Sequence, residues 1–173
     1  MANSVIFKYE KSNIRCNRIN WILTCKKLVE SGEQVHLVGR EKSTLSELAN
    51  ELNSTFTTCD VLEESFSEKI INDLKDEQVN GLAYCVGSID LKPLKLTKKS
   101  DFMQSFNLNL VSATEIIKSL ADNLKASKGS IVLFSTVAVQ QGFPNHAIVS
   151  SAKGAVEGLT LALAAEYAPN IRV

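Results

Sequence analysis

The chain has 173 residues, of which 45% are hydrophobic and 22% are charged. This length and composition are typical of one soluble globular domain and leave too little chain for two. Lysine plus arginine and aspartate plus glutamate number 19 each, so no net positive charge would attract a nucleic acid or an anionic membrane. We therefore expect neither a nucleic acid nor a membrane as a partner.

The first residues carry no pattern typical of a leader or a membrane anchor. Their apolar run is Val5–Phe7, whereas a secretory segment needs roughly 7–15 apolar residues and a membrane helix about 18. The four cysteines form no CxxC pair and the two histidines lie far apart, so we expect no metal site and no disulfide framework. A reduced, cytoplasmic location is the expected one.

Apolar runs rich in β-branched residues predict strands at Val35–Gly39, before Asp60, at Gly81–Gly87 and at Ser130–Ser135. They show no polar alternation, as expected for a parallel sheet that is covered on both faces. Helical spacing follows the first run from Leu45 onward.

Helices are predicted between and after these strands. Thr44 with Glu47 resembles a capping box at the start of the first, and Asp60 with Glu63 offers a similar start to the next. A long helix is predicted from about Lys99 to Lys125, and another from about Val149 to Tyr167. The strand–helix alternation predicts right-handed βαβ units and a doubly wound parallel sheet between two layers of helices.

Ligands of such sheets bind at the carboxyl ends of the strands. This rule selects the residues after Gly39, Cys59 with Asp60, Cys85–Gly87, and the residues after Ser135. From these patterns alone the chain is a nucleotide-binding α/β domain, with a flavodoxin-like fold as the alternative. No repeat or linker interrupts residues 1–173, so we expect a single domain.

From about Ser31 to Val173 the sequence resembles the short-chain dehydrogenase/reductase family. The motifs that carry the resemblance are VGR (38–40), CDV (59–61), CVG (85–87, where the family usually has NAG), LNL (108–110) and HAIVSSAKGAVEGLTLALAAEYAPNIRV (146–173). The resemblance implies a Rossmann-like NAD(P)-binding domain. It also implies an NAD(P)(H)-dependent oxidoreductase that acts on a small carbonyl or alcohol substrate.

The resemblance assigns catalytic roles to Asn109, Thr136 and Lys153. Thr136 stands at the family's serine position and keeps a hydroxyl for the substrate carbonyl. Lys153 would also hold the nicotinamide ribose. The family's tyrosine position, four residues before the lysine, is Val149. Because valine cannot transfer a proton, the chain is an atypical member, and a water relay through Thr136 and Lys153 is one route that remains.

The loss of the tyrosine leaves a second function open. The chain could be a non-catalytic dinucleotide-binding or scaffold protein that retains the fold, a pseudoenzyme. Ser150, Ser151 and His146 are close in sequence to the tyrosine position, but their positions differ from it. Cofactor binding without turnover would favour this alternative.

The resemblance assigns cofactor binding to Arg40, Asp60, Val61, Gly87 and Lys153. A basic residue after the second strand favours the 2′-phosphate of NADP, although NAD is possible. Each assignment has a structural alternative. An arginine can be exposed at a helix start, an aspartate can cap a helix, and a glycine can end a strand. Asn109 could be a buried polar group. Cys85 and His36 are expected to be packing residues.

The glycine-rich phosphate loop of the family is absent, since no glycine precedes Gly32. One permitted set of codons for Arg15–Trp21, read one base later, encodes Gly-Ala-Thr-Gly-Ser-Ile-Gly. Shifting residues 13–25 in this way yields IFGATGSIGSSLA, a strand end, a glycine turn and a helix start. We therefore infer a compensated pair of frameshifts, and the alternative is a diverged loop that functions as written.

The sequence stops inside or just after the strand that would be the sixth in the family. We expect the sheet to be incomplete at that edge and the substrate-binding segment to be missing. The two long helices are the usual dimer face of the family, which implies a homo-oligomer for the intact parent.

Overall fold

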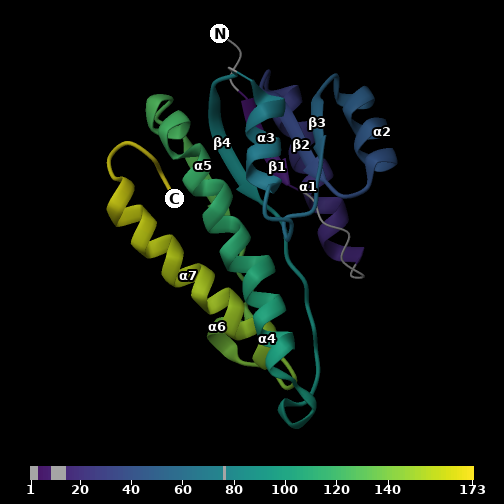
Figure 1. Ribbon diagram of the computed structural model, residues 1–173, viewed down its shortest axis with the longest axis vertical. Helices are drawn as coiled ribbons and strands as arrows, with labels where there is room; N and C mark the ends of the chain where they lie inside the picture. Colours follow the sequence, from purple (N-terminus) through teal and green to yellow (C-terminus); the bar gives the residue numbers. More distant parts are fainter. Residues whose placement is uncertain (1–3, 9–14, 76) are drawn as a thin grey trace.

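The computed structural model describes residues 4–8, 15–75 and 77–173, which form a five-stranded sheet with helices on both faces (Figure 1). The strands are β1 (Ser4–Lys8), β2 (Gln34–Gly39), β3 (Thr55–Thr58), β4 (Val79–Tyr84) and β5 (Ser130–Leu133). Their order is β3-β2-β1-β4-β5, and every neighbouring pair is parallel. The predicted doubly wound α/β fold is confirmed, and its strand order reverses between β1 and β4.

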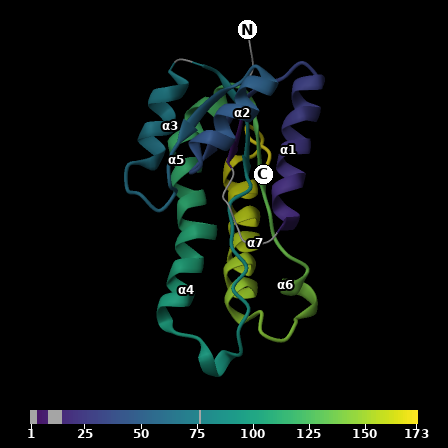
Figure 2. The same cartoon turned by 90° about the vertical axis from the view of Figure 1, so that its right-hand side faces the viewer.

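The helices cover the two faces of the sheet. They are α1 (Arg15–Glu30), α2 (Lys42–Leu52), α3 (Phe66–Leu74), α5 (Ser112–Ala126) and α7 (Ala147–Tyr167). Figure 2 shows α1 on one side of the sheet and α3 and α5 on the other. Successive residues of β2 follow this division, because Leu37 packs in the core cluster of α1 and α2, whereas Val38 packs in the cluster that contains α3 and α5 residues.

Strand β1 was not among the predicted strands. Its apolar part is only three residues long, so the local pattern is weak. It nevertheless pairs along its whole length with β2 on one side and β4 on the other. Pairing with a strand on each side therefore holds β1 in the sheet, although its sequence pattern is weak.

The long helix predicted from Lys99 to Lys125 is interrupted. It consists of α4 (Lys99–Phe106), the π-helical turn η2 (Asn107–Val111) and α5. Single π-turns inside α-helices are frequent at functional sites, and this one contains Asn109. The helix predicted from Val149 to Tyr167 is confirmed as α7, with a start two residues earlier.

Two smaller predictions were wrong. Helix α2 begins at Lys42 with Glu41 as its N-cap, so Thr44 and Glu47 lie inside the helix and make no capping box. The strand predicted at Gly81–Gly87 ends at Tyr84, which places Cys85–Gly87 in the loop that follows β4.

The last residues lie beside β5. Arg172 forms one parallel bridge with Ser130, and two backbone hydrogen bonds, Ile131 N–H to Arg172 O at 2.7 Å and Arg172 N–H to Gly129 O at 3.1 Å, hold it there. In the described part of the chain, α7 is the one helix long and apolar enough to cross a membrane. Five of its residues are buried in this domain, and a helix that packs in this way meets the same criteria.

Candidate functional site

Three predicted residues meet where β4 ends. A Cβ atom built on Gly87 would lie 2.8 Å from Asn109 Oδ1 and 3.2 Å from Lys153 Nζ. Both distances are shorter than ordinary Cβ contacts, so any other residue at position 87 would force the Asn109 and Lys153 side chains to move. The structure therefore gives Gly87 a definite steric role at the carboxyl edge of the sheet.

Asn109 is held rigidly, with 1% of its surface exposed. Its Nδ2 donates to the carbonyl oxygen of Ser105 at 2.9 Å and to the Ser105 hydroxyl at 3.3 Å. Its Oδ1 is one of the buried side-chain oxygens that accept no hydrogen bond from the described residues. A buried acceptor without a hydrogen bond costs about 1–3 kcal/mol. The fold therefore places this oxygen next to Gly87 at an energetic cost.

Lys153 lies on α7 in a largely buried position. Burial lowers the pKa of its ammonium to about 8, an effect that Cys85 partly opposes. No carboxylate of the residues described by the structure forms an ion pair with Lys153 within 4.0 Å. A lysine with this pKa is mostly protonated at pH 7 and can still release its proton near neutrality.

Cys85 is a close electrostatic neighbour of Lys153. Burial raises the pKa of the Cys85 thiol to about 12, and Lys153 acts in the opposite direction. The side chain packs against the core cluster of α1 and α2. A thiol with this pKa stays protonated at neutral pH, so Cys85 serves as a packing residue.

Thr136 lies in the turn between β5 and the short helix α6 (Ala138–Gln141). Its Oγ1 accepts a hydrogen bond from the Ala138 N–H at 3.3 Å, and its carbonyl oxygen accepts one from the Val139 N–H at 3.1 Å. The hydroxyl can therefore still donate a hydrogen bond of its own. Thr136 is not among the atoms that meet at Gly87, but it borders the same edge of the sheet.

Val149 is buried, one helical turn before Lys153. The hydroxyls near it are engaged with the backbone. Ser150 donates to the carbonyl oxygen of Ala138 at 3.1 Å, and Ser151 donates to that of Ala147 at 2.8 Å. The neighbouring serines thus have structural partners and do not take the place of a phenol.

His146 precedes α7 and acts as its N-cap residue. Its Nδ1 lies 2.7 Å from the carbonyl oxygen of Pro144, and its ring packs against Phe143 with centroids 5.4 Å apart. Nδ1 therefore carries the proton in this arrangement. Its contacts lie within the loop that precedes α7.

The residues expected at the adenosine lie together at the ends of β2 and β3. Arg40 Nη1 is 3.5 Å from Asp60 Oδ2, and both side chains are partly exposed. Asp60 Oδ1 also accepts the Leu62 N–H at 3.0 Å, so it caps a turn and not the helix α3, which begins at Phe66. Val61 is buried, and its carbonyl oxygen accepts the Ser112 hydroxyl at 2.9 Å.

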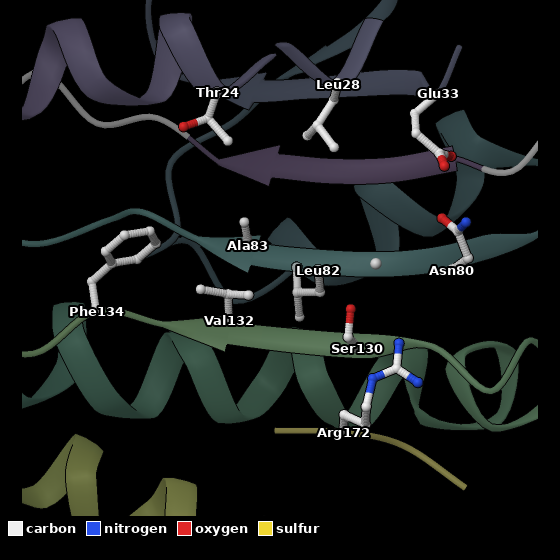
Figure 3. Close-up of a pocket in the computed structure, with 11 residues that line it drawn as sticks. Thr24, Leu28, Glu33, Asn80, Leu82, Ala83, Ser130, Val132, Phe134 and Arg172 are labelled. Carbon is white, nitrogen blue, oxygen red and sulfur yellow. The ribbon is translucent and has the colours of Figure 1, made fainter. Parts of the chain in front are cut away.

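A cavity of about 380 Å³ lies away from this cluster, on the face of the sheet next to α1 (Figure 3). Ala83, Val132 and Phe134 give it an apolar floor, and Asn80, Glu33 and Arg172 lie at one end (Figure 3). None of the predicted site residues lines it, so its size is not a guide to the chemistry.

One contact escaped the sequence patterns. The Ser135 hydroxyl donates to the carboxylate of Glu157, which joins the residue before Thr136 to α7. The signal that could have found it is the spacing of Glu157, four residues after Lys153 and hence on the same face of the helix.

Comparisons with known proteins agree on one family. The profile of the short chain dehydrogenases matches residues 22–173. L-xylulose reductase of Mesocricetus auratus is 30% identical over 152 residues, which cover 84% of this chain and 61% of that protein. A tropinone reductase homologue of Arabidopsis thaliana is 33% identical over 82% of this chain and 58% of that one. The chain therefore spans about three fifths of the length of these relatives.

Solved structures show the same fold at lower identity. The L-sorbose reductase of Gluconobacter frateurii, solved with NADPH and L-sorbose, has a TM-score of 0.87 at 16% identity, covering 99% of this chain and 67% of that one. ElxO with NADP bound has a TM-score of 0.84 at 23% identity, covering 100% and 71%. The profile match begins after the segment in which the glycine loop is missing.

Proposed function

Because the chain belongs to the short-chain dehydrogenase family, we propose that it is an NAD(P)(H)-dependent oxidoreductase acting on a small carbonyl or alcohol. The observation that carries the proposal is the convergence of Asn109 and Lys153 on Gly87. This cluster lies at the edge of the sheet where ligands of doubly wound folds bind. Relatives named as reductases support the same activity.

The residues at this edge fit a nicotinamide dinucleotide. Asn109 offers a buried acceptor, Lys153 offers ammonium donors, and Arg40 places a partly exposed cation after β2. We propose NADP as the preferred cofactor, with NAD possible, because a cation at Arg40 suits the 2′-phosphate. Two similar proteins were solved with NADPH or NADP bound. When bound, the dinucleotide supplies or accepts the hydride.

The proton would come from Lys153. Carbonyl reduction requires one proton on the substrate oxygen, and Val149 cannot provide it. In this proposal the ammonium of Lys153 releases a proton through water to the Thr136 hydroxyl, which passes its own proton to the substrate oxygen. Lys153 is then reprotonated from solvent. Its pKa of about 8 suits both steps near neutral pH.

The proposal is tested in two stages on the purified protein. Titration with NADPH and NADH by fluorescence measures binding, and a screen of small ketones and aldehydes then measures NADPH consumption. We expect tighter binding of NADPH and measurable turnover that Lys153→Met abolishes, while Lys128→Met, on the surface turn after α5, has no effect. A folded protein that binds neither dinucleotide would overturn the proposal. Binding without any turnover would leave a pseudoenzyme.

We also propose that the protein is a cytoplasmic homo-oligomer. Large apolar side chains are exposed on the long helices, with Met103 of α4 at 53%, Val111 of η2 at 45% and Leu161 of α7 at 75%. Cys25, Cys59 and Cys85 are free thiols, which suits a reducing compartment. Light scattering of the full-length protein tests the assembly, and a monomer at micromolar concentration would contradict it.

A further inference from the structure

Two hydrogen bonds join α7 to the segment that carries Thr136. On the amino-terminal side, the Ser135 hydroxyl donates to the Glu157 carboxylate. On the carboxyl-terminal side, the Ser150 hydroxyl donates to the carbonyl oxygen of Ala138 at 3.1 Å. The segment from 135 to 138 is therefore fastened to one helix at both ends.

These contacts bracket both residues of the proposed proton relay. Thr136 lies between the two attachment points of the loop, and Lys153 lies between Ser150 and Glu157 on the helix. Residues separated by three, four and seven positions share one face of an α-helix. The two helix anchors are about 10 Å apart along the axis at 1.5 Å per residue, with Lys153 near the middle.

The loop between the anchors is itself well fixed. Thr136 Oγ1 accepts the Ala138 N–H, and its carbonyl oxygen accepts the Val139 N–H, which closes a tight turn at the start of α6. With the turn closed and both ends attached to α7, the Thr136 hydroxyl has little freedom to move relative to Lys153. The Ser135–Glu157 hydrogen bond is exposed and the Ser150–Ala138 hydrogen bond is partly buried, and together they hold the segment against α7 at two points.

We propose that Glu157 and Ser150 are positioning residues that set the separation between Thr136 and Lys153 for proton transfer. The inference rests on the proposed function. A phenol at position 149 would lie on the same helix as the lysine and would need no such attachment. Because Val149 stands there, the proton must pass through a group on a different element, and small displacements of a relay group cost large factors in rate.

The experiment compares kcat, KM and NADPH affinity for Glu157→Ala and Ser150→Ala with those of Glu166→Ala, an exposed glutamate near the end of the same helix. We expect kcat to fall about tenfold in each of the first two, as when a reacting group loses its fixed position. KM for the carbonyl and the dissociation constant for NADPH should match the control. Glu157→Gln keeps an oxygen that accepts the Ser135 hydroxyl and should restore most of kcat.

A second measurement separates this inference from the proposed function. Nitrogen-15 NMR of the lysine side chains follows the titration of Lys153 in each variant. We call the hydrogen bonds from Ser135 to Glu157 and from Ser150 to Ala138 the clamp. Breaking either bond should admit water and move the pKa of Lys153 from about 8 toward its ordinary value of 10.5. This readout shows whether the clamp fixes the surroundings of Lys153 even if the wild-type protein binds cofactor and turns nothing over.

The outcomes are distinct. Lowered kcat with unchanged KM, rescue by Glu157→Gln and a raised Lys153 pKa support the clamp. If Glu157→Ala and Ser150→Ala equal Glu166→Ala in both kcat and the Lys153 titration, the clamp is overturned while the oxidoreductase proposal stands. If the wild type shows no turnover, the oxidoreductase proposal and the role of the clamp in proton transfer both fail, and the Lys153 titration then shows only whether the two contacts fix the surroundings of Lys153.

Discussion

The two halves of the sheet differ in the side chains that they place near its carboxyl edge, where ligands of doubly wound folds bind. Beyond β4, the side chains of Asn109 from η2 and Lys153 from α7 converge on the loop at Gly87. On the side of β1 and β2, helix α1 carries Trp21, which is 3% exposed in a core cluster with Cys25 and Leu37. One half brings polar side chains together at the carboxyl edge of the sheet, whereas Trp21 and Cys25 of α1 lie in the core.

The two departures from the family pattern, Val149 and the segment before residue 22, are therefore of different kinds. Val149 is a single residue at the position where the resemblance predicts a tyrosine, in a half where Asn109 and Lys153 lie close to Gly87. The segment before residue 22 departs in sequence from the family profile, and its last residue, Trp21, fills core volume. Trp21 as written therefore has a packing role, whereas the frameshift hypothesis places a glycine at its codon. The side chains of Arg15 and Arg18 lie outside the described residues.

The largest expected effect comes from Trp21→Ala. Removing a buried tryptophan should lower the free energy of unfolding by about 3–5 kcal/mol. Urea denaturation measures the change, and Leu23→Ala, at a half-exposed position of the same helix, should cost well under 1 kcal/mol. If Trp21→Ala lowers the free energy of unfolding as little as Leu23→Ala does, Trp21 has no packing role and the contrast between the two halves of the sheet is weaker.

Replacing residues 13–25 with IFGATGSIGSSLA tests whether a glycine-rich phosphate loop restores cofactor binding. A glycine turn before a helix offers backbone N–H groups to a pyrophosphate, so NADPH should bind about 100-fold more tightly, or about 2.7 kcal/mol. Isothermal titration calorimetry measures the affinity. Unchanged or weaker binding would favour a diverged loop that functions as written, and the nucleotide sequence of the gene provides an independent check.

On the other half, Lys153→Met should stabilise the fold while it abolishes turnover. The folded pKa of Lys153 is about 8 and the unfolded value is 10.5, so the charged form is disfavoured by folding at every pH below 8. Removing that burial cost should raise the free energy of unfolding at pH 7 by about 1–3 kcal/mol. The gain should vanish as pH rises through 8 to 10.5. A loss of stability at pH 7 would contradict the burial of the charge.

The smallest effect concerns His36, which is buried in β2. Its Nδ1 lies 2.7 Å from Thr55 Oγ1 and its Nε2 lies 3.0 Å from Thr57 Oγ1, while the Thr57 hydroxyl donates to Asp73 at 2.5 Å. Since Thr57 spends its proton on Asp73, Nε2 donates and Nδ1 accepts. The sequence-based expectation that His36 is a packing residue therefore misses a hydrogen-bond network.

Burial lowers the pKa of His36, and Glu77 and Asp73 partly oppose this. A lowered folded pKa means that the unfolded chain binds more protons below pH 6.5, so stability is full above 6.5 and declines as pH falls from there. We expect a loss of about 1 kcal/mol per pH unit below 6.5. His36→Phe should flatten this dependence, whereas His146→Gln should leave it unchanged. A pH-independent wild type would contradict the assignment.

Much of the fold was predictable because buried parallel strands leave unalternated apolar runs, and because α7 has a long helical period. Strand β1 was not predictable, since pairing on both sides compensates for its short apolar core. The prediction of a capping box at Thr44 was wrong because the helix begins at Lys42, with Glu41 as an N-cap residue that makes no side-chain cap.

The sequence motifs predict Asn109, Lys153 and Gly87 as site residues but not the contacts among them. Only the fold shows that a Cβ atom on Gly87 would lie within 3.2 Å of both other side chains. The pairing of Arg40 with Asp60 joins two strands and has no local pattern. The bond from Ser135 to Glu157 likewise depends on how α7 lies against β5.

The π-turn at Asn107–Val111 has a consequence for how this chain tolerates change. A turn that contains one extra residue rotates everything after it by about 100° relative to everything before it. The face of α4 that contacts α7 and the buried face of α5 therefore point in directions that depend on the rotation made by this turn. Deleting one residue from this turn would restore a regular helix but swing one of those faces into solvent, so substitutions here should be tolerated far better than deletions.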